Sequence, residues 1–125
     1  METQTLIILD TNFLIYCAEK KIDYKSRINE LMSSGHKVVV PTQVIDELKK
    51  ISHVSKKLSD RSAASLALQL LNHNKIPEIL TTGKNADEGI LKIQSNNVVA
   101  TLDYNLKKNV ERALVISPKG KLGLV

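Results

Sequence analysis

Short apolar runs alternate along the chain with longer stretches in which apolar residues recur at helical spacing. An uninterrupted apolar run predicts a strand buried on both faces, as in a parallel sheet. Such runs occupy residues 6–9, 38–40 and 114–116, and residues 98–102 form a similar run that only Thr101 interrupts. Two further strands, at residues 76–80 and 122–125, are expected at the sheet edges. For the first of them, the reason is that Pro77 cannot donate a ladder hydrogen bond.

The stretches between these strands have the apolar spacing of helices. Helices are expected at residues 13–18, 28–32, 41–51, 63–71, 85–93 and 105–113. Ser33, Ser34 and Gly35 are expected to end the second helix, and the polar segment 52–60 to form a mobile loop. Strands that alternate with helices predict an α/β three-layer sandwich, with a parallel sheet covered by helices on both faces.

Composition is consistent with one globular domain spanning residues 1–125, because 42% of the residues are hydrophobic and 25% charged. Cys17 is the sole cysteine, which excludes an intrachain disulfide and favours a reducing, cytoplasmic location. The first apolar run stops after four residues at Asp10, unlike a signal peptide. The longest apolar run, residues 13–18, is far short of the ~20 residues of a membrane span, so no membrane partner is expected.

Basic residues exceed acidic ones, 18 against 13, and they cluster in two tracts. Residues 49–61 and 107–121 each hold five basic residues and one acid. Such clustering suggests a polyanionic partner such as nucleic acid, whose backbone the lysines would contact. The lysines expected to do so are Lys49, Lys50, Lys107 and Lys108, with Lys56 and Lys57 as further candidates. Ordinary solvated lysines are the alternative.

One short motif occurs twice, each time after a predicted strand and at the start of a predicted helix. Leu9-Asp10-Thr11-Asn12-Phe13 and Leu102-Asp103-Tyr104-Asn105-Leu106 share the form Leu-Asp-x-Asn-apolar. Ligands of open parallel sheets gather at the carboxyl ends of the strands, where both aspartates are expected. The alternative is that each aspartate only caps its helix.

Two further acids lie on predicted helices. Glu47 is placed at the border of an apolar helix face and leans toward the protein body, with a pair to Lys50 as the alternative. Asp87 falls on the second position of a helix that Asn85 and Glu88 would cap. It points to the apolar face there, while simple stabilisation by the helix dipole is the alternative.

If Asp10, Glu47, Asp87 and Asp103 converge, four negative charges share one small cleft. Carboxylates so close together cannot all stay ionised unaided, and a divalent cation resolves this. An all-carboxylate site suits Mg²⁺ or Mn²⁺, which can activate water and offset charge on a phosphodiester. The rest of the chain has a balance of +9, because 18 basic residues then face nine acidic ones. A negative cleft in a basic body favours hydrolysis of nucleic acid.

At these residues the sequence resembles the PIN-domain ribonuclease family. The similar segments are LIILDTNFLI, VVVPTQVIDELKK, NADEGILKIQ and VVATLDYNLKK. The resemblance implies a parallel sheet in the order 3-2-1-4-5 and a Mg²⁺- or Mn²⁺-dependent endoribonuclease. It gives Asp10, Glu47, Asp87 and Asp103 catalytic and metal-binding roles. Supporting roles fall to Asn12, Thr101 and Asn105, the last of which replaces an acid found in some members.

The resemblance admits two branches of the family. The segments TNFLI and ADEGIL are more similar to the stand-alone nucleases that process ribosomal RNA than to VapC-like toxins. The implied partners are RNA, a second copy of the chain in a homodimer, and an antitoxin or a ribosome-assembly factor. Tyr104 is the one aromatic residue expected to touch a nucleotide.

Two other functions are compatible with an acidic Mg²⁺ site on this fold class. A receiver-like signalling domain needs paired acids after the first strand, but Asp10 stands alone there. A non-catalytic RNA-binding module would keep the same acids without turnover.

Overall fold

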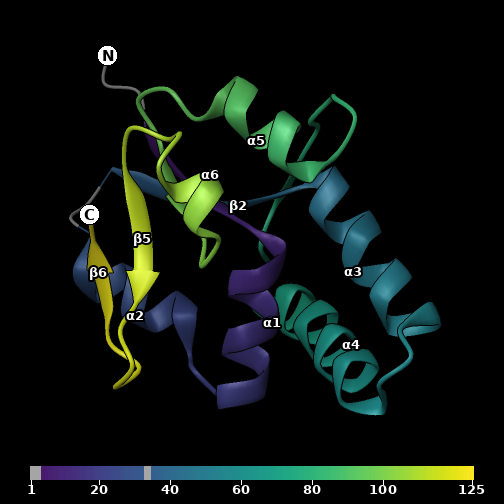
Figure 1. Cartoon of the computed structure of the whole chain (residues 1–125). Helices are drawn as coiled ribbons and strands as arrows, with labels where there is room; N and C mark the ends of the chain where they lie inside the picture. Colours follow the sequence, from purple (N-terminus) through teal and green to yellow (C-terminus); the bar gives the residue numbers. More distant parts are fainter. Residues whose placement is uncertain (1–3, 33–34) are drawn as a thin grey trace.

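The computed structural model describes residues 4–32 and 35–125 (Figure 1). Ser33 and Ser34, which were expected to end a helix, lie outside the described residues, as do the first three residues of the opening segment. The strands are β1 (Thr5–Leu9), β2 (His36–Pro41), β3 (Glu78–Ile79), β4 (Val98–Ala100), β5 (Ala113–Ile116) and β6 (Leu122–Leu124). The helices are α1 (Thr11–Lys20), α2 (Tyr24–Leu31), α3 (Thr42–Val54), α4 (Leu58–His73), α5 (Ala86–Ile93) and α6 (Tyr104–Lys107).

The strands form one sheet in the order β3-β2-β1-β4-β5-β6. Strands β1 to β5 pair in parallel, and β6 adds an antiparallel edge beside β5. This confirms the expected α/β fold and the order 3-2-1-4-5, with β6 as an extension. The chain leaves β1 for β2 on one side and reaches β4 on the other, so a topological switch point lies between β1 and β4.

Strand β1 is the centre of the core. Ile7, Ile8 and Leu9 are each 0% exposed, although neighbouring residues of a strand face opposite sides of the sheet. Both faces of the sheet are therefore covered at β1, which confirms the three-layer sandwich. Burying each of these side chains stabilises the fold by about 1.5–3 kcal/mol. The end of β1, where Asp10 follows Leu9, is thereby held in place.

Helices α1, α3 and α4 pack together beside the sheet (Figure 1). Helix α4 presents small side chains to this contact, and Ala63, Ala64 and Ala67 are buried. Helix α3 buries Val44 and Leu48, two residues of the apolar face expected for it. The small residues of α4 let the helix axes approach closely, which fixes α3 and the residues that it carries.

The prediction of a mobile loop at residues 52–60 was wrong. Helix α3 continues to Val54 and α4 begins at Leu58, so only three residues join them. The Arg61 guanidinium donates to the carbonyl oxygens of Ser55 (2.6 Å) and Lys56 (3.3 Å). These bonds pair carbonyl groups that a polar connection would otherwise leave to water.

The helix expected at residues 105–113 is much shorter, because α6 ends at Lys107. The reason lies in the sheet: Ala113 already pairs with Val99, and the Arg112 carbonyl accepts from the Val99 N–H (3.0 Å). The chain must turn between Lys107 and Arg112 to reach β5. Strand β4 likewise ends at Ala100, two residues before its expected end.

Candidate active site

Two neighbouring strands end at the same level of the sheet. Leu9 of β1 is in register with Ala100 of β4, and the Asp10 N–H donates to the Ala100 carbonyl (3.0 Å). Asp10 and Thr101 therefore leave the sheet side by side, at the switch point. This is the place where parallel sheets bind ligands.

A cavity of about 310 Å³ opens at this point, and all four predicted acids line it. Its lining residues are Asp10, Thr11, Asn12, Ile15, Glu47, Ile51, Asp87 and Asp103. We call this cavity the acidic pocket. Its four carboxylates come from the end of β1, from α3, from the first turn of α5 and from the start of α6. The structure thus brings together acids that lie up to 93 positions apart in the sequence.

Asp10 is the most deeply buried of the four acids. Its residue is only 3% exposed, and burial raises the pKa of its carboxyl from 3.8 to about 6. The negative charges of Asp87 and Glu47 contribute to this rise, and hydrogen bonds from Thr101 and from the Thr11 backbone oppose it, so that about 6 is the net value of the pKa. The Asp10 side chain makes no capping bond to α1. Its carboxylate therefore faces the acidic pocket rather than serving the helix.

The predicted supporting residues Thr101 and Asn12 connect the two strand ends. The Thr101 hydroxyl donates to Oδ2 of Asp10 (2.8 Å) and accepts from the Asp103 N–H (3.0 Å). Asn12 Oδ1 accepts from the Leu102 N–H (3.0 Å). One fully buried hydroxyl thus fixes the position of Asp103 relative to Asp10.

Asp103, unlike Asp10, does cap its helix. Its Oδ1 accepts from the backbone N–H groups of Asn105 (2.9 Å) and Leu106 (3.4 Å) at the start of α6. The capping bonds use Oδ1 alone, and the same carboxylate also lines the acidic pocket. Capping and a role in the pocket, which the sequence presented as alternatives, are therefore compatible here. Asn105 supports Asp103 through its backbone, and its own side chain does not line the pocket.

Glu47 and Asp87 form the more open side of the pocket. Burial raises the pKa of the Glu47 carboxyl, and the charge of Asp87 adds to the rise. The Thr11 side chain and the positive charge of Lys50 lower it. Burial and the charge of Asp103 likewise raise the pKa of Asp87. Each of the four carboxylates therefore interacts electrostatically with at least one of the others.

The N-terminus of α5 has the cap that the sequence predicted. Asn85 Oδ1 accepts from the Glu88 N–H (2.9 Å), so Asp87 occupies the second helical position. The side chain of Gln43, on α3, donates to the Gly83 carbonyl (3.0 Å) and so ties the segment before α5 to α3. These contacts hold Asp87 opposite Glu47.

The four lysines predicted to bind substrate belong to two elements. Lys49 and Lys50 are exposed on α3, and Lys107 and Lys108 lie at the end of α6. Lys50 also lines a smaller hollow of about 270 Å³, which shares Glu47 with the acidic pocket.

Sequence reasoning missed Lys84, the second lysine in that hollow. Lys84 directly precedes Asn85, the residue that caps α5. Its position just before a predicted helix that carries a candidate acid was the only sequence signal for a role at this site. The apolar wall of the acidic pocket, Ile15 and Ile51, was not predicted either.

No acid of the acidic pocket has an ion-pair partner within 4 Å among the residues that the structure describes. Within residues 4–32 and 35–125, the one ion pair closer than 4 Å joins Lys92 to Glu88 (3.8 Å), outside the pocket. In the same part of the chain, no three His, Cys, Asp or Glu side chains are placed to hold a metal ion as they stand. The donor set still fits a hard cation in its chemistry, because all of its ligand atoms are oxygens. Burial, and then the negative charge of neighbouring acids, raises the pKa of Asp10, Glu47 and Asp87, and a bound cation would offset both effects.

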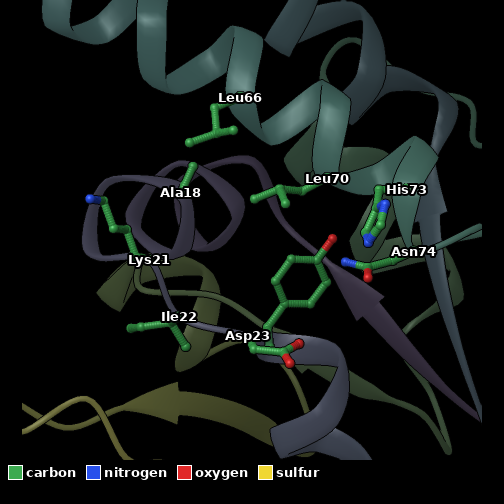
Figure 2. Close-up of a pocket in the computed structure, with 9 residues that line it drawn as sticks. Ala18, Lys21, Ile22, Asp23, Leu66, Leu70, His73 and Asn74 are labelled. Atoms are coloured by element: carbon green, nitrogen blue, oxygen red, sulfur yellow. The ribbon is translucent and has the colours of Figure 1, made fainter.

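A second cavity, of about 350 Å³, lies at the opposite end of α1 (Figure 2). Ala18 and Ile22, with Leu66 and Leu70 of α4, form its apolar walls, and His73 and Asn74 lie at one end. It shares no lining residue with the acidic pocket. The ten residues of α1 span ~15 Å, so this cavity is not an extension of the acidic pocket.

Fold, switch point and acidic pocket together define a class of protein, and comparison with known proteins gives its family. The model of the PIN like domain matches residues 7–118, and the chain belongs to this family. Because the chain belongs to the PIN-like family, the alternative of a receiver-like signalling domain is excluded.

Individual relatives agree with this assignment. The chain is 32% identical over 108 residues to ribonuclease VapC4 of Methanocaldococcus jannaschii, covering 83% of this chain and 81% of the relative. Among solved structures, the PIN domain endonuclease Utp24 superposes with a TM-score of 0.76 at 22% identity, covering 95% of this chain and 90% of that one. A chain from the structure of VapBC2 of Rickettsia felis bound to a promoter DNA fragment superposes with a TM-score of 0.52 at 16% identity. The superposition covers 90% of this chain and 100% of that chain. These two structures share the fold.

No helix within the described residues is both long enough and apolar enough to cross a membrane.

Proposed function

We propose that this chain, as a single domain over residues 1–125, is an endoribonuclease that depends on Mg²⁺ or Mn²⁺. The observation that carries the proposal is the acidic pocket: four carboxylates from four segments, with no ion-pair partner within the described residues. Membership of the PIN-like family and 32% identity to a ribonuclease support RNA as the substrate.

In this proposal Asp10, Glu47, Asp87 and Asp103 hold the cation. When bound, such an ion polarises a water and offsets the charge that develops on the phosphodiester. Thr101 keeps the Asp10 carboxylate oriented, and Asn12 fixes the loop that carries Asp103. Glu47 lies on the open side of the pocket, where its carboxylate would also orient the attacking water.

The lysines around the pocket would bring the RNA backbone to it. Each group of lysines shares an element with a pocket acid: Lys49 and Lys50 lie on α3 with Glu47, Lys84 precedes the α5 that carries Asp87, and Lys107 and Lys108 lie at the end of α6, which Asp103 caps. Positive groups of this kind contact phosphates regardless of sequence. Binding is therefore expected to depend on salt more than on bases.

Cleavage of RNA with defined ions tests the proposal. Purified chain is expected to cleave single-stranded or structured RNA internally with Mn²⁺ or Mg²⁺, and to stop in EDTA. Asp10→Asn should lower the rate by more than about 100-fold, because even residues behind a metal ligand contribute 10–100-fold. Glu19→Gln, an exposed acid at the far end of α1, is the control and should cleave as wild type. Wild type that leaves RNA intact under all ions would contradict the proposal and favour a non-catalytic RNA-binding module.

A VapC-like toxin is the second candidate for the biological role, and the identity to VapC4 favours it. Processing of ribosomal RNA is the first candidate, on the motifs of the opening segment and of α5. Induced expression in a bacterial host separates the two. Growth arrest by wild type but not by Asp10→Asn would favour a toxin with an antitoxin partner. Unimpaired growth with specific cleavage of a ribosomal RNA precursor would favour processing with an assembly partner. Light scattering on the purified chain tests the homodimer.

A further inference from the structure

Tyr104 differs from the other aromatic residues of the chain in its exposure. All four aromatics lie within the described residues, and Phe13 and Tyr24 are buried against one another with ring centroids 6.2 Å apart. Tyr16 is half-buried, whereas Tyr104 is 69% exposed. Helix α6 is anchored by Leu106, which is 3% exposed. The Tyr104 ring is therefore not needed to fill the core.

The backbone of Tyr104 is held next to the acidic pocket. Its neighbour Asp103 lines the pocket, and Thr101 and Asn12 fix the loop that leads to both residues. The Asp103 carboxylate also accepts from the N–H groups that follow Tyr104 in α6. An aromatic ring is thus attached to a rigid segment one residue from a pocket acid.

Two cations accompany this ring. Lys107 Nζ lies 5.5 Å and Lys108 Nζ 5.7 Å from the centroid of Tyr104. An exposed aromatic face beside positive side chains is the combination with which proteins bind single strands, because bases stack on the ring while phosphates meet the cations. The lysine side chains are long and flexible, so a base can take a place over the ring while the ammonium groups move to the phosphates. A base within a duplex is already stacked and cannot do this.

We propose that Tyr104, Lys107 and Lys108 form a nucleotide-binding subsite that stacks an unpaired base of the RNA next to the acidic pocket. The substrate is consequently single-stranded at the position bound there, and a fully paired duplex is not bound in this way. This inference rests on the proposed endoribonuclease function, and it deepens that function by naming the residues that bind an unpaired nucleotide.

Binding measured without cleavage tests the subsite. The probe is a labelled single-stranded RNA of mixed sequence, about 12 nucleotides long, in low salt with EDTA, followed by fluorescence anisotropy. Tyr104→Ala is expected to weaken binding about 10-fold, whereas Tyr104→Phe, which keeps the ring, should bind as wild type. Tyr104→Leu, which keeps apolar bulk without an aromatic face, should behave like Tyr104→Ala. A duplex of the same length should bind equally to all four proteins.

A scan with abasic nucleotides distinguishes stacking from a general structural effect. One abasic position should weaken binding to wild type as much as Tyr104→Ala does, and should have no further effect on the Tyr104→Ala protein. The inference is overturned if Tyr104→Ala binds single strands as wild type, if no position shows this coupling, or if wild type prefers the duplex or binds neither.

Cleavage assays run in parallel keep the two proposals apart. Wild type that cleaves RNA with Mn²⁺ but shows no coupling at Tyr104 retains the endoribonuclease function and loses the subsite. Wild type that shows the coupling but never cleaves retains the subsite, on an RNA-binding module rather than a nuclease.

Discussion

At the scale of single residues, the hydroxyl of Thr101 determines how two carboxylates of the acidic pocket sit relative to one another. It donates to Asp10 and accepts from the Asp103 backbone, and it is fully buried. Thr101→Val keeps the shape and removes both bonds. We expect it to lower the free energy of unfolding by about 1–3 kcal/mol, because the part-buried Asp103 N–H and the buried Asp10 carboxylate each lose a partner. The activity should fall about 10–100-fold. Thr101→Ser restores the hydroxyl, and urea titration with a cleavage assay should find it near wild type.

The buried charge of Asp10 makes the metal-free chain sensitive to pH. Its pKa is about 6 in the folded chain and 3.8 when unperturbed, so the unfolded chain loses this proton first. Stability from this group is therefore fully present below about pH 4 and is lost as pH rises through about 6. The difference corresponds to about 3 kcal/mol at pH 7. In EDTA, Asp10→Asn should be more stable than wild type by up to about that amount at pH 7, and the gap should shrink toward pH 4. A gap of equal size at both pH values in urea titrations would contradict this account.

The two Leu-Asp-x-Asn motifs show what residue types alone can and cannot predict. Their place after buried strands was enough to put Asp10 and Asp103 at one edge of the sheet. The capping behaviour was not predictable, because it depends on which way each carboxylate turns. Asp10 bonds to the Thr101 hydroxyl from a neighbouring strand, a partner 91 positions away, and so leaves α1 uncapped. Only the fold supplies that partner.

At the scale of elements, the contact of α5 with α3 positions Asp87, and Gly89 makes that contact possible. A Cβ at Gly89 would lie 2.1 Å from Gln43 Oε1 and 3.0 Å from the Thr81 Cβ. Gly89→Ala must therefore displace the end of the Gln43 side chain, which holds the Gly83 carbonyl, and crowd the Thr81 Cβ. We expect a loss of about 1–3 kcal/mol in the free energy of unfolding, together with reduced cleavage.

Gly123→Ala is the matched control for this prediction. A Cβ at Gly123, in β6, meets no atom within 4 Å. Thermal unfolding should place it within about 0.5 kcal/mol of wild type. Equal stability of the two alanine variants would show that the α3–α5 contact is not as tight as the structure indicates.

The extents of elements were predicted less well than their types. The spacing of apolar residues distinguishes strands from helices, and each expected strand is present in the structure. Helix ends depended instead on particular side-chain and strand contacts. Arg61 bonds to the short connection that lets α3 continue to Val54 and α4 begin at Leu58, and the pairing of Ala113 with Val99 ends α6 early. Local polarity at residues 52–60 carried no information about the Arg61 bonds.

At the scale of the whole molecule, the sheet order converts separated acids into one pocket. Apolar period predicts parallel strands, and their carboxyl ends must share one edge. Sequence spacing does not show that α3 and α5 bring Glu47 and Asp87 to the same strand ends, and here the family resemblance supplied the expectation. The pocket lining confirms the convergence. The roles of the four acids as metal ligands and catalysts remain a prediction that the cleavage assay tests.

The charge distribution of the molecule leads to a prediction about salt. Apart from the four pocket acids the chain has a balance of +9, and Lys50 and Lys84 border the pocket through the hollow they share with Glu47. Each phosphate contact by a lysine contributes about 0.7 to the slope of log K against log salt for single strands. The double variant Lys50→Gln/Lys84→Gln should therefore bind single-stranded RNA more weakly and lower the slope by about 1.4, as measured by anisotropy at several salt concentrations.

Two lysines far from the pocket provide the control for this measurement. Lys20 is the last residue of α1, and Asp10 precedes the first residue of that helix. Lys37 is near the start of β2, and it is the end of β2 that leads into α3, the helix with Glu47. Lys20→Gln/Lys37→Gln removes the same net charge as Lys50→Gln/Lys84→Gln. If net charge alone attracted the RNA, both double variants would lose affinity and slope equally. If the strand follows a path across the acidic pocket, the distant pair should keep the wild-type slope, because a lysine that contacts no phosphate releases no counterion.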